Sequence, residues 1–168
     1  GGGVLTLGNA NTYVGNTILS AGSLLVTSLG NGSGTTASSL GASGGSLRFN
    51  ADADLNFLYV GAGETASRPV VFASAITATR AHRIDASGSG PLVLSSVTNS
   101  NTGAFTMNLD LRGANTDNNM ITSSLANNGT SVLGVIKNDG GTWVLNPSSA
   151  NSFTGGITVT AGNLEIGR

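Results

Sequence analysis

The chain has no cysteine, a single histidine, three prolines and few charges, with only 9% of its 168 residues being Asp, Glu, Lys or Arg. Without cysteine it has no disulfide framework and no thiolate chemistry. One histidine argues against a metal site built from histidine ligands. The charged fraction lies far below the roughly 25% of typical soluble domains. Candidates for acid–base chemistry are therefore few and can be weighed one by one.

The charges that do occur are dispersed and nearly balanced, with seven basic and eight acidic residues. Nucleic-acid binding needs a basic stripe that releases counterions from phosphates, and the sequence contains none. It also lacks a polybasic segment for anionic membranes. No apolar run approaches the ~20 residues of a membrane-spanning helix. We therefore expect no nucleic-acid partner and no membrane insertion.

What the chain has in abundance is glycine, small polar residues and branched apolar residues. Glycine supplies 26 positions, and 39% of the residues are apolar. Branched side chains mixed with Ser, Thr and Asn suit strands joined by tight turns. The small polar residues and glycine have weak helix propensity. The composition predicts an almost wholly β fold, as one domain or one slice of a larger array.

A segment near the beginning of the chain returns near its end. Residues 10–26 align without a gap with residues 150–166, at an offset of 140. The identical pairs are Ala10/Ala150, Asn11/Asn151, Gly15/Gly155, Ala21/Ala161, Gly22/Gly162 and Leu24/Leu164. Upstream, residues 3–7 correspond to residues 141–145. One full period plus an overlap is what an excerpt of a tandem protein, or a subunit with matching ends, would contain.

Each copy predicts a strand, an Asn-aromatic turn, a second strand, an Ala-Gly turn and a third strand, which make one coil of a three-sided parallel β-helix. In the first copy these strands cover residues 4–7, 17–20 and 23–26. Further strands are expected at residues 47–50, 55–60, 70–73, 82–85, 92–95, 105–111 and 132–136. Residues 78–83 and 118–125 could each hold a helical turn. We expect roughly six or seven coils in one solenoid segment over residues 1–168.

The pattern Gly-x-Leu-x-Leu, Ala-Asn-x-aromatic-x-Gly and Thr-Val-x-Ala-Gly-x-Leu-x-Val resembles the autotransporter-associated β-strand repeat, also called the passenger-associated transport repeat. Residues 3–26 and 141–167 carry it, and looser solenoid coils are expected between them. The resemblance implies a right-handed parallel β-helix outside a bacterial cell, in an autotransported or secreted passenger. It also implies an adhesive or structural role and assistance in outward passage of the passenger.

Stacked coils of a parallel β-helix lie about 4.8 Å apart, so equivalent side chains form ladders along the axis. The expected inward positions of the first copy are Leu5, Leu7, Ile18, Leu24 and Val26, and the outward ones are Thr6, Thr17 and Ser23. Asn11 and Asn151 are expected to bond backbone groups at corners. Unpaired strand edges at the two ends favour covalent continuation or head-to-tail stacking into fibres.

Two groups of charged residues are candidates for a site like those of β-helix polysaccharide lyases and hydrolases. Asp52 and Asp54 could bind Ca²⁺ or act as acid and base, although a solvated turn explains them as well. The second group comprises Arg80, His82, Arg83 and Asp85. It could form a base and a clamp if a carboxylate from a neighbouring coil joined it. We interpret it instead as a surface corner with local ion pairs.

The remaining candidates are an oxygen-rich loop and the aromatic residues. Asp117 lies among Asn and Thr residues but lacks the ligand spacing of an EF-hand loop. Trp143, Tyr13, Tyr59 and Phe153 could stack on sugars if they are exposed. Because Tyr13 and Phe153 occupy equivalent positions of the repeat, packing at a corner is the simpler interpretation.

Together these observations predict an extracellular or cell-surface β-solenoid element that is structural or adhesive and not an enzyme. We expect no catalytic, cofactor-binding or metal-binding residues. The expected partners are other copies of the chain, bound end to end through the terminal coils, and glycans or matrix surfaces. The alternative is a carbohydrate-active β-helix enzyme, which would need several charged residues to converge in one groove.

Overall fold

The computed structural model describes residues 3–32, 35–42 and 44–167. Within these ranges all regular structure is strand, and no helix is long and apolar enough to cross a bilayer. The strands are β1 (Val4–Leu7), β2 (Thr17–Leu19), β3 (Ser23–Val26), β4 (Leu47–Phe49), β5 (Leu55–Tyr59), β6 (Ala62–Ala66), β7 (Val70–Phe72), β8 (Arg80–Ala86), β9 (Gly90–Leu94), β10 (Val97–Asn99), β11 (Thr106–Arg112), β12 (Asn119–Ile121), β13 (Val132–Lys137), β14 (Thr142–Leu145), β15 (Ile157–Val159) and β16 (Asn163–Ile166).

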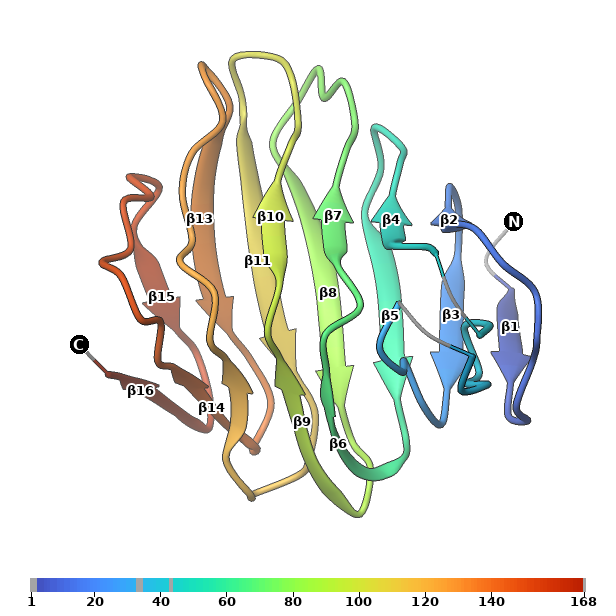
Figure 1. The fold of residues 1–168 in the computed structure, drawn as a ribbon. Coiled ribbons are helices and arrows are strands. Elements are labelled where there is room, and N and C mark those ends of the chain that lie inside the picture. The colour runs from blue at the N-terminus through green and yellow to red at the C-terminus, as the bar shows by residue number, and fades with distance from the viewer. Residues whose placement is uncertain (1–2, 33–34, 43, 168) are drawn as a thin grey trace.

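The strands form three parallel sheets. From β5 to β11 the chain visits all three in turn, whereas β1–β4 and β11–β16 alternate between two of them. The seven-stranded sheet has the order β1-β3-β5-β8-β11-β13-β15, the four-stranded sheet β10-β7-β4-β2 and the five-stranded sheet β16-β14-β12-β9-β6. Each pass of the chain adds a strand at the growing end of a sheet, so that the sheets lengthen along the axis of the stack. Figure 1 shows the coils following one another from β1 to β16, with the two ends of the chain at opposite ends of the stack. The predicted parallel β-solenoid is confirmed.

The solenoid has about five turns, fewer than the predicted six or seven. In the middle of the seven-stranded sheet, Phe57 pairs with Ile84 and Ile84 with Leu111, so one coil takes 27 residues there. Between β3 and β4 the chain makes a long excursion over residues 27–46 that contains no named strand in its described part. Because the coils are longer than the strand spacing indicated, and the excursion uses further residues, the chain completes fewer turns than predicted.

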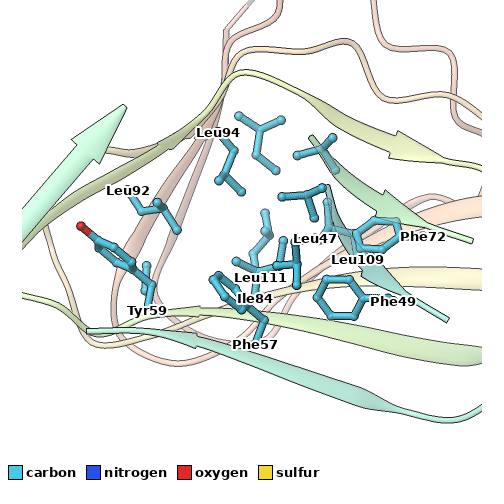
Figure 2. Packing of buried hydrophobic residues seen from close by; sticks show 14 of the residues in the cluster. Leu47, Phe49, Phe57, Tyr59, Phe72, Ile84, Leu92, Leu94, Leu109 and Leu111 are labelled. Atoms are coloured by element: carbon cyan, nitrogen blue, oxygen red, sulfur yellow. The ribbon is translucent and has the colours of Figure 1, made fainter. Parts of the chain in front are cut away.

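The core is built from the inward residues of all three sheets. In β5, the fully buried Leu55, Phe57 and Tyr59 alternate with half-buried Asn56 and Leu58. Alternation of this kind is expected where one face of a strand packs inward and the other meets solvent. Figure 2 shows residues from several coils, among them Phe57, Ile84 and Leu111, pointing into one shared interior. Stacked coils thus form one continuous apolar core.

Several local predictions need correction. In β2, Ile18 faces outward and is 54% exposed, whereas Thr17 and Leu19 pair with the buried Leu47 and Phe49. The expected assignment of Ile18 and Thr17 is therefore reversed. Of the segments given a possible helical turn, residues 78–83 include the first part of β8 and residues 118–125 contain β12. Strand β6 was not predicted, because its Gly, Glu and Ala residues have low strand propensity. Strand β10 was also missed; it is only three residues long, too short to show a clear alternation.

The two repeat copies build the same one-coil unit. In the first copy β1 pairs directly with β3, and in the second β14 pairs with β16, with equivalent residues in the same register. The Ala-Gly turn before the third strand also has the same geometry, since Gly22 and Gly162 have φ of 72° and 71°. Glycine adopts this conformation without steric cost. The copies differ in which sheets their strands join.

Candidate functional site: a polar ladder on the seven-stranded sheet

The outward face of the seven-stranded sheet carries a row of polar side chains. Register places Ser23 beside Asn56, Asn56 beside Arg83 and Arg83 beside Asp110. The Asn56 amide donates to Ser23 Oγ at 3.2 Å, and Arg83 donates to Asn56 Oδ1 at 3.3 Å. The four residues of this row lie on four successive strands of the sheet, β3, β5, β8 and β11. We call this row, together with the residues that extend it below, the polar ladder.

Asp110 is the centre of the ladder. Its side chain is only 3% exposed, and Arg83 and Arg112 approach the same oxygen, Oδ2, at 3.4 and 2.8 Å. The Asn138 amide donates to the other oxygen, Oδ1, at 2.7 Å. A buried carboxylate is tolerated only where charged or polar partners replace its water, and here two guanidinium groups do so. Asn138 in turn bonds Thr160, which extends the ladder to the last coil.

Asp52 and Asp54 face the arginines of the following coil. Arg80 Nε lies 2.7 Å from Asp52 Oδ1, and Thr77 donates to the other oxygen of the same carboxylate. Hydrogen bonds from Arg80 and Thr77 lower the pKa of Asp52 to about 2. The solvated-turn interpretation is therefore incomplete, since Asp52 bonds residues 25 and 28 positions later.

Asp54 is held in the same way. Arg83 lies 3.0 Å from its Oδ2, and the Ala81 amide donates to its Oδ1 at 2.9 Å. Partial burial opposes ionisation, but these two hydrogen bonds outweigh it and lower the pKa of Asp54. Arg83 thus does meet carboxylates from the coils on either side, as a base-and-clamp site would require. Its Nε and both terminal nitrogens are engaged, which makes it a cross-link between coils rather than a free clamp.

His82 is not part of this surface, contrary to the prediction of a surface corner. It is fully buried, and its ring stacks on Phe49 at a centroid distance of 5.0 Å and lies 5.4 Å from Phe72. Within the described residues, neither ring nitrogen has a hydrogen-bond partner. Burial lowers the pKa of His82 to about 4. A neutral imidazole that fills core space cannot serve as a solvent-facing base.

A shallow hollow of about 260 Å³ lies on the ladder face. Its lining residues are Ser23, Asn56, Leu58, Arg83, Asp85, Arg112 and Asp139. The charges in the hollow balance, with two guanidinium groups and two carboxylates. Arg112 Nε is bound to Asp110, and among the described residues its terminal nitrogens approach only Asp139, at 3.9 Å. The hollow therefore offers donors and acceptors side by side without net charge.

The other candidate residues do not join the ladder. Asp117 is exposed in the loop before β12, where its carboxylate and backbone bond Asn115 and Asn119. No group of three or more metal-ligating side chains occurs in the described part of the chain. Trp143 and Tyr59 are buried core residues, and Phe153 packs against the core. Tyr13 is half-exposed and hydrogen-bonds Thr17 at 2.6 Å.

Asparagines at corners bond the backbone of neighbouring coils. Asn151 Oδ1 accepts from the Leu125 amide at 2.8 Å, and Asn11 donates to the Ser39 carbonyl at 2.9 Å. The predicted corner-capping role of Asn11 and Asn151 is confirmed. Each bond satisfies a backbone group where the strand ladder is interrupted, and so keeps the coils in register through the turns.

Besides Asp110, two buried charged groups, Arg68 and Lys137, were missed from the sequence. Arg68 is 1% exposed and donates to the carbonyls of Leu29, Gly41 and Gly45, while Glu64 accepts from the amides at the start of the same excursion. Together they fasten the described part of residues 27–46 against the solenoid. Lys137 is also buried, and its Nζ donates to the Asp139 carbonyl at 2.8 Å. Burial lowers the pKa of both Arg68 and Lys137.

Comparison with known proteins agrees with this architecture. The passenger-associated-transport-repeat family model matches residues 1–26 and 135–166. A relative described as adhesin BmaC autotransporter, from Brucella suis biovar 1 (strain 1330), is 37% identical over 144 residues, which cover 80% of this chain and 4% of the relative. The chain thus spans a small fraction of that relative's length. No solved structure matches the chain. The chain is a β-solenoid that carries two passenger-associated transport repeats and is similar over most of its length to an autotransporter adhesin, which confirms the resemblance found in its sequence.

Proposed function

We propose that the chain is a non-catalytic segment of a bacterial surface or secreted passenger, where it serves as a rigid β-solenoid element with an adhesive outer face. The observation that carries the proposal is the combination of transport repeats with a solenoid similar to an adhesin autotransporter. The same likeness supports an extracellular or cell-surface location.

The ladder supports a mechanical role for the seven-stranded sheet. Ion pairs and hydrogen bonds run along the axis from Ser23 to Thr160, and each links a coil to the next. A solenoid in which each coil contacts only its neighbours depends on such nearest-neighbour contacts for stability. Within the ladder, Arg83 and Asp110 hold each other in fixed positions, which supports a scaffold function better than acid–base chemistry.

The adhesive surface we propose is the hollow beside Arg112. Its paired donors and acceptors, without net charge, suit the hydroxyl groups of a neutral glycan or the polar surface of a matrix protein. Leu58 supplies an apolar patch among them. Binding at one shallow hollow is expected to be weak, so that strong attachment would require many sites along a long rod.

Surface display tests this proposal. The chain would be displayed on non-adherent bacteria, and attachment to immobilised glycans and matrix proteins would be measured. Arg112→Gln combined with Asp139→Asn should reduce attachment severalfold, whereas Asp117→Asn, on a different surface, should leave it unchanged. Attachment no greater than that of cells displaying an unrelated solenoid would contradict the adhesive role. Cleavage of polysaccharide by the purified chain would instead support a carbohydrate-active enzyme.

We further propose that copies of the solenoid associate end to end. The two ends expose strand edges and apolar side chains that the middle coils cover with their neighbours. Head-to-tail contacts between unlike ends do not close on themselves and so build filaments. Electron micrographs of the purified chain at rising concentration would show rods of increasing length if this association occurs.

A further inference from the structure

The hollow on the polar ladder is elongated along the axis of the solenoid. Its lining residues come from consecutive strands of the seven-stranded sheet, namely Ser23 of β3, Asn56 and Leu58 of β5, Arg83 and Asp85 of β8, Arg112 of β11, and Asp139, which follows β13. Figure 1 shows these five strands side by side, in the order in which they pair. Since neighbouring strands lie about 4.8 Å apart, the hollow extends over about 19 Å across the strands.

In the direction of the strands the hollow is narrow. The paired register puts most of the lining in two rows, Ser23–Asn56–Arg83 and Leu58–Asp85–Arg112. The rows are two residues apart along each strand, which corresponds to about 7 Å. Both ends of the hollow lie within the chain, because β1 pairs with β3 beyond Ser23 and β15 pairs with β13 beyond Asp139. The hollow is therefore a short groove that crosses the strands, and we call it the axial groove.

The chemistry of the axial groove changes along its length. At the β3 end, Ser23 and Asn56 offer a hydroxyl and an amide, and in the middle the half-buried Leu58 supplies an apolar surface. At the β13 end, the terminal nitrogens of Arg112 approach no carboxylate closer than Asp139, at 3.9 Å, among the described residues. Their N–H groups are therefore available to a ligand. Polar groups placed around an apolar patch are typical of sites that orient a small polar ligand.

The geometry points to a linear, uncharged, β-1,4-linked glycan that lies along the axial groove, with about one sugar on each strand. This inference rests on the proposed adhesive role of the hollow and specifies its ligand. An extended β-1,4-linked pyranose chain advances per sugar by roughly the spacing of the strands, so the groove accommodates about four sugars. The apolar face of a pyranose ring can pack on Leu58, and its hydroxyls can donate to Asp139 and accept from Arg112.

An extended peptide fits the axial groove less well than a glycan. Proteins that bind a peptide as an added strand use an exposed sheet edge, whereas β5, β8 and β11 each have a paired strand on both sides. A peptide lying across these strands would have to satisfy its backbone N–H and C=O groups with a few side chains. The hydroxyls of a sugar both donate and accept, so the mixed donors and acceptors of the groove suit a glycan in either direction.

An anionic polymer also fits the axial groove less well. A carboxylate or phosphate bound to Arg112 would lie in the same groove as Asp85 and Asp139. Like charges at close range raise the free energy of the complex. The second guanidinium of the groove, that of Arg83, is already engaged through its Nε and both terminal nitrogens. The groove is therefore expected to select uncharged sugars over uronates.

The length of the glycan tests its orientation. The purified chain would be titrated with β-1,4-linked oligomers of glucose and of N-acetylglucosamine, from the disaccharide to the hexasaccharide, and the Kd of each measured by NMR. For the series that binds, affinity should rise about tenfold from disaccharide to tetrasaccharide and little beyond, because the groove is then filled. Equal Kd values for disaccharide and tetrasaccharide would overturn the axial orientation. Oligomannuronate, which is β-1,4-linked but anionic, should bind severalfold more weakly, and tighter binding would overturn the preference for uncharged sugars.

Variants within the axial groove test which residues the glycan covers. Ser23→Phe fills the β3 end, three strands or about 14 Å from Arg112, and should reduce tetrasaccharide affinity to about that of the disaccharide. A ligand lying along one strand would not reach both ends, so undiminished tetrasaccharide binding by this variant would contradict the inference. Leu58→Ser should weaken binding severalfold, whereas Val71→Ser, at a half-buried outward position of the four-stranded sheet, should not. Urea unfolding checks that each variant is folded.

The same material separates failure of this inference from failure of the proposed function. If no oligosaccharide of either series binds at millimolar concentration, the glycan ligand is refuted. If displaying cells nevertheless attach to immobilised matrix protein, and Arg112→Gln with Asp139→Asn reduces this attachment, the adhesive role of the hollow stands with a protein as its ligand. If the cells attach to neither kind of surface, the adhesive role fails together with the inference.

Discussion

The middle coils and the end coils share the same alternation of inward and outward residues, but their inward side chains are buried to different extents. Phe57, in the middle of the seven-stranded sheet, is fully buried, whereas Leu5, at the same inward level of the first coil, is 61% exposed. Nothing in the two local sequences predicts this difference. In a solenoid, an inward side chain becomes a core residue only when coils lie on both sides of it. The stability of each position therefore depends on its place along the axis.

The largest expected effect tests this contrast directly. Phe57→Ala should lower the free energy of unfolding by about 3–5 kcal/mol, because it removes a buried aromatic ring and leaves a cavity. Leu5→Ala should cost about 1 kcal/mol or less, since most of the side chain already contacts solvent. Urea denaturation at a concentration where the chain is monomeric measures both. Similar losses for the two variants would mean that the end coil is covered in solution.

The next effect concerns the imidazole in the middle coils. The folded-state pKa of His82 is about 4, below the ordinary value of 6.5, so the unfolded chain binds more protons between these pH values. The contribution of neutral His82 to the free energy of unfolding should be fully present above pH 6.5 and fall as pH decreases toward 4. The expected loss is about 3 kcal/mol, since one pKa unit corresponds to about 1.4 kcal/mol. Unfolding curves across this range measure the slope. His82→Leu should abolish it, because no other histidine exists; a slope that persists would contradict this origin.

A smaller effect is expected on the outer face. Asp110→Asn removes the charge that two arginines share at the centre of the polar ladder, and should destabilise the chain by about 1–3 kcal/mol, the usual range for a buried charged hydrogen-bonding group. Asp117→Asn, at an exposed position, should change stability by less than about 0.5 kcal/mol. Thermal and urea unfolding of both variants measure the difference. Equal stability would show that the ladder does not hold the middle coils together.

The smallest effect is expected at the half-buried ion pair of Asp52 with Arg80. Because the pKa of Asp52 is lowered from 3.8 to about 2, its contribution to stability should be present above pH 3.8 and decline as pH falls toward 2. Asp52→Asn should therefore flatten the acid limb of the stability curve slightly. Screening by 1 M salt should reduce the contribution of the same pair at neutral pH. A variant with an unchanged acid limb would indicate that the pair is fully solvated.

Much of the fold could be predicted from the local alternation of apolar and polar residues. The inward positions of Leu24 and Val26 and the outward position of Ser23 are as expected, because β3 alternates strictly in a strand with one buried face. The assignment failed in β2, where only three residues are paired and alternation alone does not indicate which face is inward. It also missed β6, whose Gly, Glu and Ala residues have low strand propensity, and β10, which is only three residues long.

The candidate site was less predictable than the fold. Asp52, Asp54, Arg80 and Arg83 were recognised as charged residues of interest, but their partners lie 25 to 29 residues away. Asp110, the most buried carboxylate of the ladder, was not predicted as a candidate, because nothing near it in the sequence is unusual. His82 was grouped with its charged neighbours, although alternation in β8 turns it inward between two phenylalanine rings.

By itself, the sequence determined the class of fold, the repeat and the identity of the turns, because glycine, asparagine and branched residues impose their preferences within a few positions along the chain. Only the tertiary structure decided which side chains meet. Coil length varies, and the excursion over residues 27–46 shifts every later residue along the axis. How the whole chain winds therefore decides which residues of neighbouring coils meet, as Arg83 and Asp110 do. It also decides which sheets the two repeat copies join.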